Sequence, residues 1–346
     1  MDSSFYTSKQ AFTIILTGMA AILLTGCGGG GSAEAQIPPS ASTTNSSSQS
    51  GSAGSPDTAN PALPSGSKYS LVSSRGTVIE TLALNPERNT YSDGSTGTGS
   101  LPASKSADTY TPPEPIGERG EVAQRILEND ERFPVYTQAY PYRATARITY
   151  NGTSYCTGWL VSKDTLVTAG HCIHDGGPTG NWRTPASLRI YPGFADGYAP
   201  YGSCGAREIY SSYAWVTQAN SDADVGVIKL DCAIGNSTGY FSYLVTTPGS
   251  TDLLTISGYP SDKAGGQQQW ASHGYLSFAT AGKLYYDNDT YSGMSGAPLW
   301  LENGNASAQA VALHTSSAYT AIGESNAGTR ISQEVFDLIS AASKLP

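Results

Sequence analysis

The stretch from Ala144 to Cys172 reads ATARITYNGTSYCTGWLVSKDTLVTAGHC, and in it short runs of β-branched and aromatic residues alternate with turn residues. Runs of this composition predict β-strands, and the pair Asn151-Gly152 between two of them predicts a tight hairpin. Similar runs recur at 188–191, 225–230, 253–257 and 310–313. Many short strands over about 200 residues are typical of a sandwich or a pair of barrels, so we predict an all-β fold.

One helix is predicted, at the C-terminal end of the chain. Within residues 332–342, Val335, Leu338 and Ile339 recur at the spacing that places side chains on one helical face. Ser332 precedes this run, and serine is a favoured residue at a helix N-terminus because its hydroxyl accepts a backbone N–H. We therefore expect a terminal helix that begins after Ser332.

The N-terminal end has the pattern of an export signal. Residues 11–26 form an apolar run of 16 residues, and about 20 are needed to span a bilayer. The run ends in LTGC, residues 24–27, which resembles the lipobox of bacterial lipoproteins, where the signal peptide is removed before a cysteine that then carries lipid. We predict a signal peptide over residues 1–26 and a lipid anchor on Cys27. An ordinary signal peptide cut near Gly26 is the alternative.

The remainder of the N-terminal third divides by composition. Residues 27–68 are rich in Gly, Ser and Pro and nearly lack large apolar side chains, which predicts a flexible, disordered tether. Residues 69–125 hold short apolar pieces between polar runs, too few for an independent domain, and we predict a pro-segment there. The folded domain is then expected at residues 126–346.

The five cysteines support an exported protein, because such proteins usually pair their thiols and five is an odd number. If Cys27 is lipidated, four cysteines are left, and sequence alone leaves three pairings open. We predict the sequential pairing, Cys156 with Cys172 and Cys204 with Cys232. The chain has no Cys-x-x-Cys motif, so we expect no metal site.

Charge excludes one class of function. The chain carries 19 Lys and Arg against 28 Asp and Glu, a net charge of −9. A nucleic-acid-binding protein normally carries a basic stripe, and the sequence shows none. We expect no nucleic-acid partner and no cofactor.

Three polar residues stand where catalytic groups are expected. His171 follows a predicted strand beside a cysteine, and a histidine on a stapled turn suits a general base. Asp224 abuts the start of an apolar strand, where a buried carboxylate can orient an imidazole. Asp222 is the alternative, and the choice of Asp224 rests partly on the resemblance given below. Ser295 lies in Gly293-Met-Ser-Gly, where a glycine amide can face an oxyanion. A turn histidine, a strand-capping aspartate and a turn serine are the structural alternatives.

The order of these residues separates two architectures. The nucleophile elbow of α/β-hydrolases is Gly-x-Ser-x-Gly, but Ala297 occupies the last glycine position. Those enzymes also have the chain order Ser, acid, His, whereas the order here is His171, Asp224, Ser295. That order is the one found in chymotrypsin.

Together these motifs resemble the glutamyl endopeptidase branch of the chymotrypsin-fold serine proteases, from about residue 126 to 339. The resemblance rests on TAGHC at 168–172, DVGVIKL at 224–230, DTYSGMSGAP at 289–298, ALHTSS at 312–317 and NAGTRI at 326–331. It implies two packed six-stranded β-barrels. It also implies that His171 is the general base, Asp224 its orienting partner, Ser295 the nucleophile, and the amides of Gly293 and Ser295 the oxyanion hole.

The specificity pocket has two rival interpretations. Asp289, six residues before Ser295, stands where trypsin-like enzymes carry the carboxylate that binds Arg or Lys. Thr290 and His314 stand where the glutamyl endopeptidases have a hydroxyl and an imidazole that bind a substrate carboxylate, and Ser317 is a further candidate donor. We favour cleavage after Glu, with Asp less well accepted and with cleavage after Arg or Lys as the alternative.

The sequence thus predicts a serine endopeptidase that acts on proteins or peptides. We expect a monomer that is exported and anchored at the cell surface or outer membrane through Cys27, with release as a soluble extracellular enzyme as the alternative. Loss of the pro-segment by cleavage after Arg125 or Glu128 is expected to mature it. The rivals are an esterase and a catalytically inactive surface binding module.

Overall fold

The computed structural model describes residues 63–84, 89–100, 125–127, 129–304, 307–320 and 323–346. The expected signal peptide, the lipidated Cys27 and nearly all of the expected tether lie outside these residues. Over the part of the chain that is described, no helix has the length and apolar character needed to cross a membrane.

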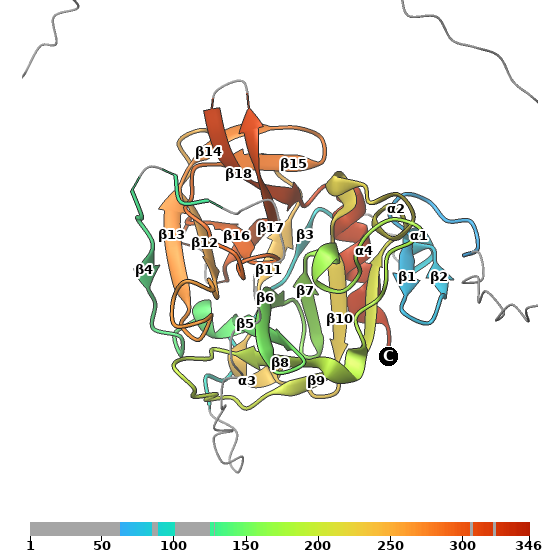
Figure 1. Ribbon diagram of the computed structural model, residues 1–346, viewed down its shortest axis with the longest axis horizontal. Coiled ribbons are helices and arrows are strands. Elements are labelled where there is room, and N and C mark those ends of the chain that lie inside the picture. The colour runs from blue at the N-terminus through green and yellow to red at the C-terminus, as the bar shows by residue number, and fades with distance from the viewer. Residues whose placement is uncertain (1–62, 85–88, 101–124, 128, 305–306, 321–322) are drawn as a thin grey trace, which may run out of the picture. The chain divides into compact units, whose positions relative to one another are not determined.

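The first half of the folded region is a closed barrel (Figure 1). Its strands are β5 (Thr145–Tyr150), β6 (Thr153–Leu160), β7 (Thr165–Thr168), β8 (Leu188–Pro192), β9 (Cys204–Ser212) and β10 (Gly226–Leu230). They pair in the order β10-β7-β6-β5-β8-β9, and β9 pairs with β10 to close the ring. The predicted hairpin joins β5 to β6, with positive φ at both Asn151 (51°) and Gly152 (83°), as a tight two-residue turn requires.

The second half is a ten-stranded sheet that curls beside the barrel (Figure 1). Its main strands are β12 (Leu254–Gly258), β13 (Trp270–Gly274), β14 (Leu276–Ala279), β15 (Lys283–Tyr286), β16 (Pro298–Leu301), β17 (Gln309–Thr320) and β18 (Gly323–Arg330). The order is β14-β15-β18-β17-β16-β12-β13-β4, where β4 is Phe133–Pro134. The short strand β11 (Ser242–Leu244) joins this sheet through β17. The predicted all-β architecture of two packed units is confirmed.

Aromatic side chains fill the space where the two halves meet. Phe241 lies edge-on to both Trp159 of β6 and Trp300 of β16, with ring centroids 5.6 Å apart in each pair. Buried aromatic pairs of this kind add to the apolar area that they remove from water. The interface between the two units therefore belongs to the core, and side chains from both units can meet in fixed positions.

The terminal helix forms as expected. Helix α4 (Gln333–Lys344) begins after Ser332, whose hydroxyl accepts the N–H of Val335. Val335, Leu338 and Ile339 are fully buried. The structure also contains short helices that sequence patterning did not predict, because they are too short to show a period: α1 (Thr81–Leu84), α2 (Tyr213–Gln218), α3 (Gly235–Thr238) and the 3-10 turns η1 (Tyr142–Ala144), η2 (Gly170–Cys172), η3 (Pro185–Ser187) and η4 (Ser221–Ala223).

The described part of the expected pro-segment packs on the folded domain. Strand β1 (Leu71–Ser73) pairs with β9 at the right-hand edge of the barrel in Figure 1, and β2 (Val78–Ile79) pairs with β1. Strand β3 (Tyr91–Ser92) pairs with β11 of the second sheet. Leu71 and Val72 are fully buried. This segment therefore extends both sheets instead of forming a core of its own.

Both predicted disulfides are present. Cys156 of β6 is bonded to Cys172 of η2, and Cys204 of β9 is bonded to Cys232. The Cys156–Cys172 disulfide ties the turn that carries His171 to strand β6. The sequential pairing is confirmed.

Candidate active site

His171 and Asp224 form a bidentate contact on the first barrel. His171 lies in η2, directly after β7, and Asp224 lies between η4 and β10, which pairs with β7. The imidazole Nδ1 is 2.8 Å from Asp224 Oδ2, and the His171 backbone N–H donates to Asp224 Oδ1 at 2.9 Å. The carboxylate thus fixes both the ring and the main chain of the histidine.

The buried carboxylate stays ionised because of its partner. Burial alone raises the pKa of Asp224, but the charge of His171 and its hydrogen bond outweigh burial and hold that pKa below its usual value. An acceptor-only carboxylate requires the proton of the imidazole to reside on Nδ1. The lone pair of Nε2 is then the basic site of the neutral ring.

The loop that carries Ser295 has a backbone that only glycine allows. Gly293 has φ +94°, and a Cβ at this position would lie 2.5 Å from the carbonyl oxygen of Tyr259. The carbonyl of Ser292 accepts the N–H of Ser261 at 2.7 Å. Because a trans peptide points its C=O and N–H in opposite directions, this bond turns the Gly293 N–H away from Ser261.

The same loop packs directly on the turn that holds His171. The Ser295 carbonyl accepts the N–H of Thr157 at 2.9 Å and lies 3.7 Å from the sulfur of Cys172, the residue next to His171. A Cβ on Gly296 would lie 2.3 Å from the Thr157 carbonyl. The structure therefore brings the loop of Ser295, from the second sheet, against the histidine-bearing turn of the first barrel.

His314 of β17 adjoins this loop and is buried. Its carbonyl accepts the N–H of Gly296, and its N–H donates to the carbonyl of Ala297. The Tyr286 hydroxyl lies 2.6 Å from His314 Nδ1. Burial, together with the charges of His171 and Lys283, lowers the pKa of His314 to about 3, so the ring is neutral at physiological pH.

The tautomer of His314 follows from its neighbour. Burial raises the pKa of Tyr286 well above its usual value, so the phenol keeps its proton. We assign this proton to a hydrogen bond with Nδ1, which leaves the ring proton of His314 on Nε2. Nε2 is buried and makes no hydrogen bond of good geometry among the described residues, although the Ala327 main chain lies close enough to the ring to be a minor cause that raises its pKa. Nε2 is a donor without a well-placed acceptor.

A second donor without an acceptor stands close to the same strands. The Thr290 hydroxyl is buried and lacks a partner within the described residues. Buried polar groups without partners are rare in folded proteins and usually mark places that a ligand or water completes. Ser317, the third residue predicted for the pocket, lies further along β17, opposite Asn326 of β18.

Both carboxylate oxygens of Asp289 accept main-chain hydrogen bonds in the chain as it stands before cleavage. Asp289 is 3% exposed. Its Oδ1 accepts the N–H of Leu127 at 2.6 Å, and its Oδ2 accepts the N–H of Glu131 at 2.7 Å. Both oxygens are thus used to hold the chain that enters the folded domain, which removes the structural support for a trypsin-like pocket in the uncleaved chain.

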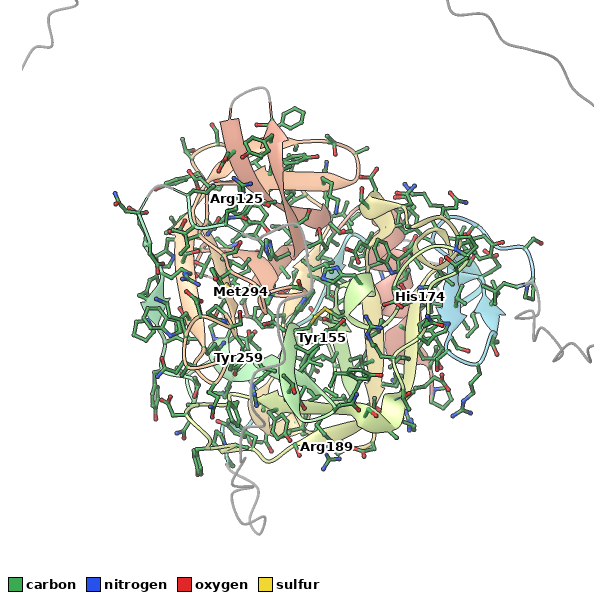
Figure 2. The ribbon with its side chains drawn as sticks, viewed as in Figure 1. Arg125, Tyr155, His174, Arg189, Tyr259 and Met294 are labelled. Carbon is green, nitrogen blue, oxygen red and sulfur yellow. A yellow bond between two sulfur atoms is a disulfide. The ribbon has the colours of Figure 1, made fainter. Side chains whose placement is uncertain are left out.

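The residues just before this entry point also contact the pocket strands. The carbonyl of Arg125 accepts the N–H of Thr290 at 3.1 Å and the side-chain amide of Asn326 at 2.7 Å. Arg125 and Met294 are labelled in the part of Figure 2 occupied by the second sheet. Met294 is fully buried and stands where trypsin-like zymogens carry an aspartate, so an activation switch through that aspartate is absent here.

Several residues of this site were not found from the sequence. Tyr286 contacts His314, and the Trp215 ring lies 6.4 Å from that of His171, between ring centroids. Lys283 touches none of the predicted residues, but its charge acts on Asp224 and His314. None of them belongs to a short motif with a known spacing. Asn326 was included in a quoted motif, but nothing in the sequence indicated its bond to Arg125.

The comparisons with known proteins agree with the fold. Residues 131–335 match the family model described as Trypsin. The chain belongs to this family and is a serine endopeptidase with protein or peptide substrates. It is 37% identical to a glutamyl endopeptidase of Bacillus licheniformis over 258 residues, which cover 71% of this chain and 77% of the relative. A solved structure of a Glu endopeptidase in complex with MPD is 31% identical, with a TM-score of 0.57, and covers 63% of this chain and 99% of its own.

One relative has a name that suggests a metal. The extracellular metalloprotease of Bacillus subtilis is 34% identical over 224 residues, 62% of this chain and 68% of the relative. Among the described residues, the groups of suitable side chains are Cys156, His171 and Cys172, and Cys204, Asp231 and Cys232. Each group contains two cysteines joined in a disulfide. Such sulfurs are not thiolates, so these donors do not fit a metal ion.

Proposed function

We propose that His171, Asp224 and Ser295 form the catalytic triad of this endopeptidase. The observation that carries the proposal is the 2.8 Å contact between His171 Nδ1 and Asp224, on a turn against which the Ser295 loop is packed. The direction of that contact leaves Nε2 as the basic nitrogen, as a base acting on a serine hydroxyl requires.

The chemistry follows from these positions. His171 takes the proton of the Ser295 hydroxyl while Ser295 Oγ attacks the carbonyl carbon of the scissile bond. The N–H groups of Gly293 and Ser295 stabilise the oxyanion that forms. His171 then gives its proton to the leaving amine, and an acyl-enzyme results. Water, deprotonated by His171, releases the carboxylic acid and restores the serine.

We further propose that the enzyme cleaves after Glu, with Asp less well accepted. The two unpartnered donors, Thr290 Oγ1 and the proton on His314 Nε2, suit a carboxylate that accepts a hydrogen bond at each oxygen. The name of the Bacillus licheniformis relative supports the same preference. Ser317 is a third candidate donor on the same strand.

The test of the reaction and of the preference uses four matched short peptides that end in Glu, Asp, Arg or Phe before the scissile bond. We expect turnover in the order Glu, Asp, then the others, and labelling of Ser295 by a fluorophosphonate. Ser295→Ala should abolish both turnover and labelling. Turnover of simple esters without turnover of peptides would favour an esterase, and activity that persists in Ser295→Ala would exclude the triad.

We propose export and surface anchoring for the full chain. Residues 1–26 act as the signal peptide, Cys27 carries the lipid, residues 27–68 form the tether, and cleavage after Arg125 or Glu128 separates residues 69–125 from the protease domain, 126–346. Two disulfides support an oxidising compartment. A Cys27→Ser variant should leave the membrane fraction. The domain is expected to elute as a monomer in gel filtration.

A further inference from the structure

A buried lysine lies behind the proposed triad. Lys283 begins β15 and is 5% exposed. Its Nζ donates to the hydroxyls of Thr315 on β17 (2.8 Å) and Thr329 on β18 (3.2 Å). No carboxylate of the described residues makes an ion pair with it. A charged ammonium is costly to bury beside neutral hydroxyls alone, which calls for a reason to retain it here.

The hydroxyl of Thr329 connects this lysine to the aspartate. Thr329 is paired with Lys283 in the β15–β18 register. Its Oγ1 lies 3.1 Å from the carbonyl oxygen of Asp224 and 3.4 Å from that of Ser221. The hydroxyl has one proton to donate. If it accepts from Lys283, that proton is free to point toward the Asp224 main chain.

The charges around this point have a clear pattern. Burial lowers the pKa of Lys283, while the carboxylates of Asp224 and Asp222 raise it. The charge of Lys283 is also one of the causes, after those from His171, that lower the pKa of Asp224. Lys283 thus faces two carboxylates on the loop that leads into β10, although it touches neither.

We propose that Lys283 is a positioning residue of the triad: its ammonium orients Thr329 against the main chain of Asp224 and balances the buried carboxylate that holds His171. This proposal rests on the triad proposed above.

The consequence for His171 can be given a sign. Asp224 contacts the ring of His171. The charges of His171 and Lys283 both act on His314, which is neutral, and those of Asp224 and Asp222 act on Lys283. On its main-chain side the carbonyl faces Tyr155, to which Arg183 donates. Loss of the Lys283 charge removes a cation that opposes protonation of the imidazole. The pKa of His171 should then rise, and the acid limb of activity should move to higher pH.

Lys229 provides a matched control. It is also a buried lysine, on β10, but its Nζ contacts the Asp164 carboxylate (3.2 Å), the hydroxyl of Thr165 and the carbonyl of Ser343. Its charge is therefore compensated by a direct partner outside the proposed triad. Replacement of either lysine by methionine removes one buried ammonium and keeps a long apolar chain.

The experiment compares Lys283→Met, Lys283→Arg and Lys229→Met with the unaltered enzyme, using kcat and KM for a Glu peptide between pH 5 and 9. In Lys283→Met we expect kcat to fall about tenfold or more with little change in KM, and the acid limb to move up by about half to one pH unit. Lys283→Arg should restore most of the pH profile. In Lys229→Met the acid limb of the pH–activity profile should stay at its original pH, even if this variant lowers the unfolding temperature as much as Lys283→Met does.

The proposal is overturned if the acid limb of the pH–activity profile does not move in Lys283→Met. It is also overturned if the acid limb moves by the same amount in Lys229→Met. If Lys283→Met does not fold, Lys283→Gln is measured through its second-order rate of inactivation by a fluorophosphonate, which reports only on the folded fraction. An unshifted inactivation profile there also overturns it. If Ser295 is still labelled in the Lys283 variants, the proposed triad is retained and only the role of Lys283 is refuted. If Ser295→Ala still turns over the peptide, the triad itself is refuted.

Discussion

The two halves of the active site differ in how completely the protein satisfies its own polar groups. On the triad side, both oxygens of Asp224 are bonded to His171. On the pocket side, Thr290 Oγ1 and His314 Nε2 are buried without a described partner. The first region is thus finished before substrate arrives, whereas the second is left for a ligand to complete. Orienting groups need fixed partners, and recognition groups need vacant ones.

The largest effect on activity is expected from a change in the His171–Asp224 pair. Asp224→Asn keeps the size of the side chain but offers a donor where the ring of His171 needs an acceptor, so the ring adopts the wrong tautomer. We expect kcat to fall about 10⁴-fold, with folding retained, measured on the Glu peptide at pH 8. A loss of less than about tenfold would falsify the role of Asp224 as the orienting partner.

A smaller effect on activity is expected from a change in the proposed specificity pocket. Thr290→Val removes the hydroxyl at nearly constant volume and should lower kcat/KM for the Glu peptide about 10- to 100-fold, with little change for the Phe peptide. Stability should not fall, because the lost hydroxyl had no partner. Thr145→Val is the matched control, since the Thr145 hydroxyl of the first barrel is also buried and unpartnered.

In Thr145→Val the ratio of Glu to Phe cleavage should not change. An equal loss in both valine variants would mean that Thr290 acts on folding and not on recognition. An unchanged ratio in Thr290→Val alone would remove this residue from the pocket.

The buried neutral imidazole of His314 should make stability depend on pH. Its pKa in the folded state is about 3, below the usual value near 6.5 in an unfolded chain. Stability is then fully present above pH 6.5 and is lost as pH falls toward 3, by at most about 1.4 kcal/mol per pH unit. The measurement is urea unfolding of the Ser295→Ala protein at pH 7, 6 and 5, which avoids self-digestion.

The control for this prediction is His314→Gln in the same background. Burial also lowers the pKa of His174, which adds a slope of the same sign, so the difference between the two proteins isolates His314. Parallel curves for the two proteins would show that folding does not lower the pKa of His314.

The smallest effect on activity is expected at Asp289. Asp289→Asn replaces one of two acceptor oxygens by an amide that faces a backbone N–H, and we expect a loss of about 1–3 kcal/mol in the free energy of unfolding. The preference among the Glu, Arg and Phe peptides should stay the same. A specific loss of Arg cleavage in this variant would instead restore the trypsin-like interpretation.

Sequence reasoning went furthest where local patterns carry the information. The strand texture, the Asn151-Gly152 hairpin, the cap at Ser332 and the two disulfides are all local or nearly so, and each was confirmed. The order of His171, Asp224 and Ser295 was enough to separate two enzyme architectures. These signals depend on neighbours in the chain, which a sequence displays directly.

The parts that were missed depend on contacts between distant strands. Asp289 was one of two rival pocket residues until the structure showed its carboxylate bonded to Leu127 and Glu131, more than 150 residues earlier. Lys283 looks like any strand lysine until the fold buries it near Asp224. No spacing rule predicts such contacts, because the register of sheets sets them.

If residues 69–125 are removed as proposed, strand β1 makes their removal a process of two steps. A cut after Arg125 breaks one covalent bond, but it leaves β1 annealed to β9, with Leu71 and Val72 still sealed from water. The cleaved segment would stay bound to the protease domain until the β1–β9 hydrogen bonds and the buried contacts of Leu71 and Val72 break. Its release would leave the end of β9 at Tyr210–Ser212 without the strand that pairs with it there.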